Sequence, residues 1–270
     1  MELIHFKPFE DTDGEVAGWL HSPISEMETF REAYPAVVVC PGGAYCFVSQ
    51  READPVALQL FAAGYNVFVL TYSINEKARD FRPLKELSET FRTIRGHARE
   101  WHTDPEKIAV CGFSAGGHLA ASLGTLWDNP EFLKHYDNRG GENRPNAMVL
   151  GYPVITADEH AHVQSIETVS GCKQGTPGYE FFSLDCHVTA GTCPTFLWHT
   201  VTDDCVPVEN SLKLMGALQK AGVSFEAHLF PTGGHGLSVC TQESGSYDPY
   251  NTRWMELCIA WLNKTFGYTL

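Results

Sequence analysis

The residues best suited to chemistry surround Ser114, which lies at the centre of a G-x-S-x-G pattern at residues 112–116. Such a serine acts as a nucleophile when it occupies a sharp turn between a strand and a helix, because small flanking residues let the two elements approach. The apolar residues before the pattern predict a strand over 107–111, and those after it predict a helix over 115–127. We therefore expect Ser114 to attack acyl groups; the alternative is a chance match at a tight helix start.

A second motif is a glycine-rich loop after the apolar run AVVVC, with the sequence PGGA at residues 41–44. It corresponds to the HGGG-type loop that supplies backbone N–H groups to a developing oxyanion, since small residues let those groups approach the substrate. We expect the donors to be Gly43 and Ala44, joined by the N–H of Ala115. Proline replaces the usual histidine and alanine the third glycine, so the match is partial, and an ordinary strand exit is the alternative.

Two later segments contain residues that suit an acid and a base. Asp203 and Asp204 follow the apolar run TFLWH, and His235 lies between two glycines after the last expected strand. Active sites of open α/β sheets lie at the carboxyl edge of the strands, so either aspartate could orient the histidine as general base. Asp204 and Glu209 are also typical of turns and helix caps. Along the chain the order is Ser114, Asp203, His235. This order of nucleophile, acid and histidine is the one found where the nucleophile lies on a turn between a strand and a helix.

Other aromatic residues and histidines give weaker signals. Tyr45, Tyr72 and Trp198 are candidates for lining an acyl or sugar pocket, although aromatic residues at strand ends also serve as core. We expect His118 and His199 to make structural hydrogen bonds rather than to transfer protons.

The elements that must position these residues alternate in type along the chain, which predicts a mainly parallel sheet with helices on both faces. The expected strands cover residues 16–20, 36–40, 66–71, 107–111, 147–151, 195–199 and 224–230. The expected helices cover residues 55–63, 83–101, 115–127, 208–221 and 252–265.

The predicted fold class is α/β, and the continuously apolar runs AVVVC, VFVL and IAVCG are typical of parallel strands buried on both faces. We expect a single domain over residues 1–270, because its length suits one α/β core. Too few residues precede the glycine-rich loop for a large cap domain. The segment 155–193 lacks periodicity and exceeds an ordinary connection, so we expect it to lie over the active site.

Composition and charge narrow the classes of partner. Hydrophobic residues make up 43% and charged residues 19% of the chain, a balance typical of a globular enzyme. The net charge of −14 argues against a nucleic-acid partner and favours a small neutral substrate, because phosphate binding needs clustered lysine and arginine. We expect no membrane partner and no signal peptide, since long apolar runs and a basic start are missing. The composition leaves the oligomeric state open.

The nine cysteines are scattered and odd in number, which indicates free thiols in a reducing, cytoplasmic setting. No close pair of cysteine or histidine has zinc-like spacing, and the HAH at residues 160–162 is expected to be a solvated loop. We therefore expect no metal site.

At these motifs the chain resembles compact bacterial carboxylesterases related to acetyl-xylan esterases and to the hormone-sensitive-lipase-like branch of α/β-hydrolases. The resemblance covers most of the chain and is carried by CPGGAYCFVSQREADPVALQLFAAGYNVFVLTYSI, DPEKIAVCGFSAGGHLAASLG, GYPVI and PTFLWHTVTDDCVPVENSLKLMGALQKAGVSFEAHLFPTGGHGLS. In that group the acid lies four residues after the histidine of an H-x-x-x-D-x-x-V-P pattern, which here selects Asp203 over Asp204. The resemblance implies an α/β-hydrolase fold and hydrolysis of short-chain acyl esters, often acetyl groups on plant-derived sugars, without a metal or organic cofactor.

Two other functions use a similar sequence pattern. Peptidases of the prolyl-oligopeptidase type have the same triad and the same H-x-x-x-D-x-x-V-P segment, but they carry an additional gating domain. A non-catalytic binding protein could also retain the fold without the chemistry.

Overall fold

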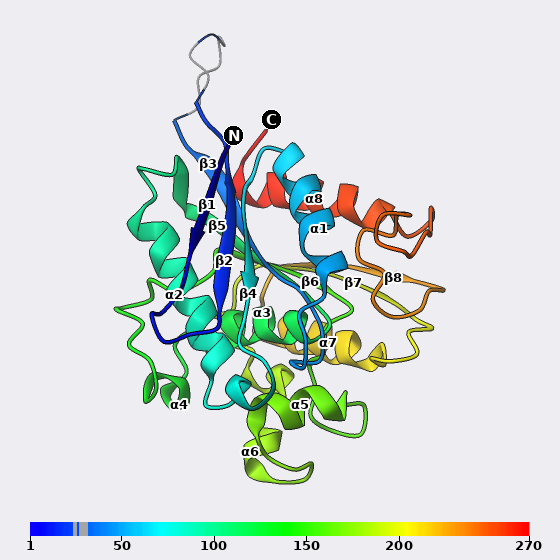
Figure 1. The fold of residues 1–270 in the computed structure, drawn as a ribbon. Coiled ribbons are helices and arrows are strands. Elements are labelled where there is room, and N and C mark those ends of the chain that lie inside the picture. The colour runs from blue at the N-terminus through cyan, green and yellow to red at the C-terminus, as the bar shows by residue number, and fades with distance from the viewer. Residues whose placement is uncertain (24–25, 27–31, 270) are drawn as a thin grey trace.

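The computed structural model describes residues 1–23, 26 and 32–269, and Figure 1 shows how their elements are arranged. These residues form an eight-stranded sheet in the order β1-β2-β4-β3-β5-β6-β7-β8. The strands are β1 (Glu2–Phe6), β2 (Glu15–Leu20), β3 (Tyr34–Cys40), β4 (Asn66–Thr71), β5 (Thr103–Phe113), β6 (Ala147–Gly151), β7 (Thr195–Thr200) and β8 (Phe225–Phe230). From β4 through β8 in this order the strands are parallel, whereas β2 pairs antiparallel with both β1 and β4.

Helices cover both faces of the sheet. The α-helices are α1 (Asp54–Ala62), α2 (Arg82–Gly96), α3 (Ala115–Leu126), α4 (Pro130–Leu133), α5 (Val163–Ser170), α6 (Pro177–Glu180), α7 (Glu209–Ala221) and α8 (Arg253–Phe266). The described residues also form three short 3-10 helices, η1 (Gln50–Glu52), η2 (Asn75–Ala78) and η3 (Leu184–His187).

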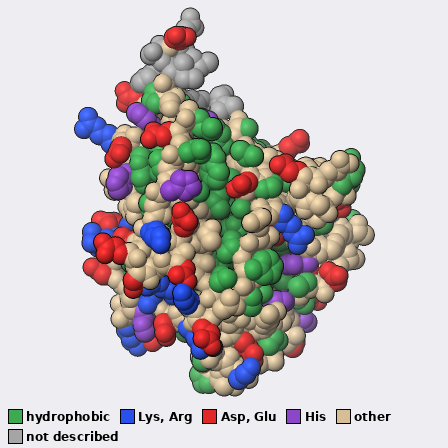
Figure 2. Space-filling model, viewed as in Figure 1, with side chains coloured by type: hydrophobic (Ala, Val, Ile, Leu, Met, Phe, Trp, Pro, Cys, Tyr) green, Lys and Arg blue, Asp and Glu red, His purple; other side chains and the backbone are tan. Residues whose placement is uncertain are grey.

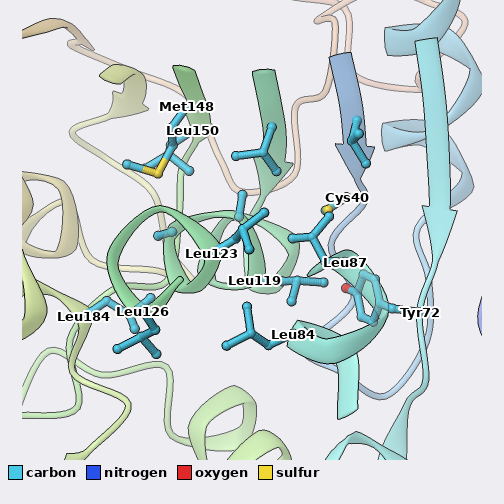
Figure 3. Packing of buried hydrophobic residues seen from close by; sticks show 14 of the residues in the cluster. Cys40, Tyr72, Leu84, Leu87, Leu119, Leu123, Leu126, Met148, Leu150 and Leu184 are labelled. Atoms are coloured by element: carbon cyan, nitrogen blue, oxygen red, sulfur yellow. The ribbon is translucent and has the colours of Figure 1, made fainter. Parts of the chain in front are cut away.

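Two hydrophobic clusters fill the spaces between the sheet and the two helical layers. On one face, Leu60 of α1 and Trp254 of α8 pack against the sheet. On the other face, leucines of α2, α3 and α7 pack beneath the same strands, and Figure 3 shows part of this cluster with Leu87, Leu123 and Leu150. Since both faces are covered, every residue of β6 and β7 is buried, which explains why β6 is continuously apolar and why β7 has the apolar run Phe196–Trp198 at its centre.

The α/β fold class and the sheet covered on both faces are therefore confirmed, with differences at the edges. Strand β1 was not among the predicted strands; it pairs with β2 alone, and its side chains are exposed apart from the half-buried Ile4 and Phe6. Strand β5 begins at Thr103, before the expected start at residue 107. Helix α2 ends at Gly96 and not at residue 101, since glycine disfavours helix continuation.

The segment 155–193 contains α5, α6 and η3 and packs against η2, α3 and α7. A hydrogen bond within the segment joins η3 to the segment's first residue, because the N–H of Leu184 donates to the carbonyl of Ile155 over 2.9 Å. The N-terminal part of α5 lies beside the glycine-rich loop, where Gln164 donates to Cys46 over 3.5 Å. Within the described residues no large cap domain covers the sheet.

Charged side chains on the surface above α2 are intermixed in sign, as Figure 2 shows. Arg82 pairs with Asp11 and Glu86, and Arg92 pairs with Glu89. These charges are balanced locally and do not form a field of one sign on this face. Among the helices that the structure describes, none combines the length and apolar character that crossing a bilayer requires.

Candidate active site

Four strand ends bring the predicted site residues to one edge of the sheet. The glycine-rich loop follows β3, Ser114 follows β5, Asp203 follows β7, and His235 lies on the loop after β8. These strands are parallel, so their carboxyl ends meet at the same edge. Residues separated by more than one hundred positions in the sequence thereby become neighbours.

Ser114 occupies a turn that only a specific packing arrangement can maintain. Its φ of 54° and ψ of −121° lie outside the regions that residues with a side chain ordinarily adopt. The turn is tight enough that a Cβ on Gly112 would lie 2.1 Å from the carbonyl oxygen of Gly116. A Cβ on Gly116 would lie 2.1 Å from the carbonyl oxygen of Cys40. The glycines therefore let β5, α3 and the end of β3 approach one another.

Three side chains form a continuous hydrogen-bonded chain at this edge. His235 Nε2 lies 2.8 Å from Ser114 Oγ, and His235 Nδ1 lies 2.8 Å from Asp203 Oδ2. Ser114 is only 8% exposed, and the Asp203 side chain is fully buried. With the Nδ1 proton directed at the carboxylate, Nε2 is free to accept the serine proton, which is the arrangement of a nucleophile, a base and an orienting acid.

Asp203 is held in place by more than the histidine. Its Oδ1 accepts the backbone N–H groups of Cys205 and Val206, each over 2.9 Å, and its Oδ2 lies 3.3 Å from Nε2 of His199. Burial opposes ionisation of Asp203, but hydrogen bonds from His199 and His235 outweigh it and hold the pKa of this carboxyl well below its usual range. Asp204 instead accepts the backbone N–H of His235 over 3.4 Å, so the structure brings Asp203 to the imidazole ring.

The lowered pKa of Asp203 predicts that the stability of the fold depends on pH. Because the carboxyl binds protons more weakly in the folded chain than in the unfolded one, its ionised form stabilises the fold above an unfolded pKa of about 4, and this contribution is lost as pH falls below that value. We expect the difference in Tm between the wild type and Asp203→Asn to shrink from about pH 6 towards about pH 2. Thermal melts followed by circular dichroism measure this, and a difference independent of pH would contradict it.

The glycine-rich loop, residues 41–47, has backbone donors available beside Ser114. Among the described residues, no acceptor is present for the N–H groups of Gly43, Ala44 and Ala115. The loop is held by its carbonyl groups, since Tyr72 donates its hydroxyl to Pro41 over 2.6 Å. Gly43 has a φ of +126°, and a Cβ there would lie 2.0 Å from the backbone oxygen of residue 47, so glycine is required at this position.

The three aromatic residues considered for a substrate pocket lie in the core. Trp198 is fully buried and stacks on Trp254 with the ring centroids 4.9 Å apart. Tyr45 and Tyr72 are buried as well, and both hydroxyls are occupied by bonds within the protein. Their positions give all three side chains a packing role and no substrate-facing surface.

His118 and His199 make the structural hydrogen bonds expected from the sequence. Burial lowers the pKa of His118 to about 4, despite its hydrogen bond to the carbonyl of Phe182, so the ring is neutral near pH 7. Its Nδ1 lies 2.9 Å from the hydroxyl of Tyr45, and this hydrogen bond holds the glycine-rich loop against α3. His199 contacts the Oγ of Ser211 over 2.7 Å and supports Asp203 from the other side.

Three residues beside this hydrogen-bonded chain were not among the candidate site residues. His162, expected on a solvated loop, is half-buried with its Nδ1 2.8 Å from the Oγ of Ser165. Burial lowers its pKa, and nearby His235 adds to the effect. Glu52 and Tyr152 lie beneath the site and contact each other, and neither occurs in a catalytic motif. In the part of the chain that the structure describes, no three His, Cys, Asp or Glu side chains are grouped to hold a metal ion.

Comparisons with known proteins place the chain among hydrolases. The family model described as BD-FAE matches residues 24–218. The chain is 35% identical over 215 residues to endo-1,4-beta-xylanase B of Butyrivibrio fibrisolvens, and the aligned region covers 77% of this chain and 33% of that protein. It is 30% identical over 213 residues to an acetylxylan esterase of Xylanibacter ruminicola, and here the aligned region covers 76% of this chain and 42% of that protein.

A solved structure matches nearly the whole chain. The acetyl ester-xyloside bifunctional hydrolase from Caldicellulosiruptor lactoaceticus superimposes with a TM-score of 0.83 and 32% identity, covering 99% of this chain and 97% of that one. By contrast, the chain spans between a third and a half of the length of the curated relatives it matches first.

Proposed function

The chain belongs to the BD-FAE family and has the α/β-hydrolase fold, and from this premise we propose that it is a serine esterase of short-chain acyl esters. The substrates proposed are acetyl esters of oligosaccharides such as acetylated xylo-oligosaccharides. The observation that carries the proposal is the chain of hydrogen bonds from Asp203 through His235 to Ser114, with 2.8 Å at each step.

In the proposed mechanism His235 accepts the proton of Ser114 through Nε2 as the serine Oγ attacks the ester carbonyl carbon. Asp203 keeps the other ring proton on Nδ1 and stabilises the imidazolium that forms. The N–H groups of Gly43, Ala44 and Ala115 bind the oxyanion of the tetrahedral intermediate, which collapses as His235 returns the proton to the leaving alcohol. Water activated by His235 then hydrolyses the acyl-enzyme, so the reaction needs no cofactor.

The choice of acetylated sugars draws support from the names of the relatives and from the charge of the chain. Two of the matched proteins are described by their action on acetylxylan or on acetyl esters and xylosides. The net charge of −14 favours neutral substrates over anionic ones. Without a large cap over the described sheet, little apolar surface remains to bind a long acyl chain.

A pair of substrate series tests this proposal. We expect the p-nitrophenyl esters to be hydrolysed fastest as the acetate, with kcat/KM falling towards the octanoate, and acetate to be released from acetylated xylo-oligosaccharides. The measurements are initial rates by absorbance and released acetate by chromatography, with Ser114→Ala as the blank. Rates that rise with chain length and no release from sugars would contradict the substrate class, and cleavage of aminoacyl anilides as fast as esters would indicate a peptidase.

A further inference from the structure

A buried carboxylate lies directly beneath the candidate active site. Glu52, the last residue of η1, is only 2% exposed. Its Oε2 accepts the backbone N–H of Gly42 over 2.8 Å, and its Oε1 accepts the hydroxyl of Tyr152 over 2.7 Å. None of the ion pairs formed by the described residues includes Glu52, so neutral donors alone satisfy this carboxylate. Burying an acid in this way is costly, which calls for a reason beyond packing.

The first donor belongs to the loop that offers the oxyanion N–H groups. Gly42 lies between the carboxylate and the nucleophile turn, since a Cβ on it would be 2.7 Å from Oε2 of Glu52 and 3.0 Å from Cβ of Ser114. The hydrogen bond from Gly42 therefore anchors the loop at the residue immediately before Gly43. Any shift of Glu52 moves the loop relative to Ser114.

The second donor leads to the loop that carries the histidine. The hydroxyl of Tyr152 accepts the backbone N–H of Ser238 over 2.8 Å while it donates to Glu52. The Tyr152 ring also meets the His235 ring edge-on, with the centroids 5.0 Å apart. The hydroxyl of Ser238 also contacts η1, because it donates a hydrogen bond to the carbonyl of Arg51. One buried acid thus touches the supports of both loops.

We propose that Glu52 is a positioning residue that keeps the oxyanion donors and His235 in register with Ser114. This inference rests on the proposed esterase function. Stabilisation of the transition state depends on donors that are already in place, and a misplacement of about 1 Å costs on the order of 100-fold in rate. Because the oxyanion forms only after attack, loss of Glu52 lowers kcat while it leaves substrate binding nearly unchanged.

The test compares Glu52→Gln with a matched buried acid outside the site. Glutamine retains the size and one acceptor oxygen but loses the second acceptor and the charge. Glu86 on α2 provides the control, because its side chain is fully buried and accepts the N–H of Ser73 over 2.8 Å. For p-nitrophenyl acetate we expect Glu52→Gln to lower kcat by about 10- to 100-fold with KM within about 3-fold, and Glu86→Gln to retain kcat even where its Tm falls equally.

A second variant, Tyr152→Phe, tests the connection between Glu52 and the loop that carries His235. Tyr152→Phe leaves the bond between Glu52 and Gly42 but cuts the connection to Ser238, so we expect a smaller fall in kcat. Combined with Glu52→Gln it should add little, since both changes interrupt one network. Should Glu52→Gln fail to fold, Tyr152→Phe decides the question by its own kcat.

Three results separate the possible failures. An unchanged kcat in a folded Glu52→Gln, or in Tyr152→Phe where Glu52→Gln does not fold, overturns the positioning role. A fall in kcat that Glu86→Gln reproduces at the same loss of Tm also overturns it, because the effect would then come from general destabilisation. A wild-type chain without esterase activity counts against the proposed function itself.

Discussion

Replacing Ser114 by alanine is expected to lower kcat for p-nitrophenyl acetate by about 10⁶-fold while the fold is retained. The Oγ of Ser114 is the atom that would form the acyl-enzyme, and no neighbouring group in the hydrogen-bonded chain can replace it. The residual rate would come from the oxyanion donors, which the substitution does not touch. Initial rates and a thermal melt of the same preparation measure the two quantities.

A matched control for this variant lies about two turns into α3, the helix that follows Ser114. Ser122 is buried, and its hydroxyl donates to the carbonyl of His118 over 2.8 Å, so Ser122→Ala removes a comparable group outside the site. We expect Ser122→Ala to retain activity and labelling by a fluorophosphonate probe, and Ser114→Ala to lose both. Labelling or turnover in Ser114→Ala would contradict the assignment. An unlabelled wild type would indicate a binding protein with the hydrolase fold.

Changing Asp203 to asparagine is expected to lower kcat at neutral pH by about 10⁴-fold. The asparagine amide can donate a hydrogen bond to Nδ1 of His235, which would leave the ring proton on Nε2, facing Ser114. The histidine could then no longer accept the serine proton, although the positions of the atoms would hardly change. The measurement is kcat of Asp203→Asn near pH 7, with the protein folded as judged by circular dichroism.

Asp204→Asn is the control for this change, because it alters the next residue without touching the imidazole ring. Among the described residues, the Asp204 side chain accepts a hydrogen bond from the backbone N–H of His235 alone, over 3.4 Å, so we expect its substitution to lower kcat by less than about 10-fold. If Asp204→Asn were the more damaging of the two, the acid would have to be reassigned.

The three residues of the hydrogen-bonded chain could be predicted because each follows a strand and belongs to a recognisable local pattern. Ser114 has its G-x-S-x-G turn, and His235 has its glycine-rich loop. The residue types alone could not distinguish Asp203 from Asp204, because both are aspartates on the same turn. They differ in the direction in which the side chain points, which residue type does not reveal. The structure separates them by placing Asp203 2.8 Å from the ring. Whether these residues catalyse the reaction stays a prediction until the variants are measured.

Other features had no local signal. Trp198 and Tyr45 looked suitable for a pocket, but their side chains point into the core, and periodicity does not reveal which aromatic residue at a strand end faces a substrate. Glu52 lies in an ordinary helical context, and only its contacts with Gly42 and Tyr152 single it out. The edge strand β1 was missed because it is short and most of its side chains are exposed, so it lacks a clear apolar pattern.

Local sequence patterns were sufficient to predict the alternation of strands and helices, the apolar central strands and the turn that holds Ser114. These are local properties, because hydrophobic periodicity and the steric demands of glycine act over a few neighbouring residues. The three-dimensional packing shows which aromatic residues belong to the core and that Glu52 joins two loops, and it places Asp203, which the family resemblance had selected over Asp204, against His235. Such contacts bridge residues far apart in the chain, and their distances depend on how the whole sheet and its helices pack.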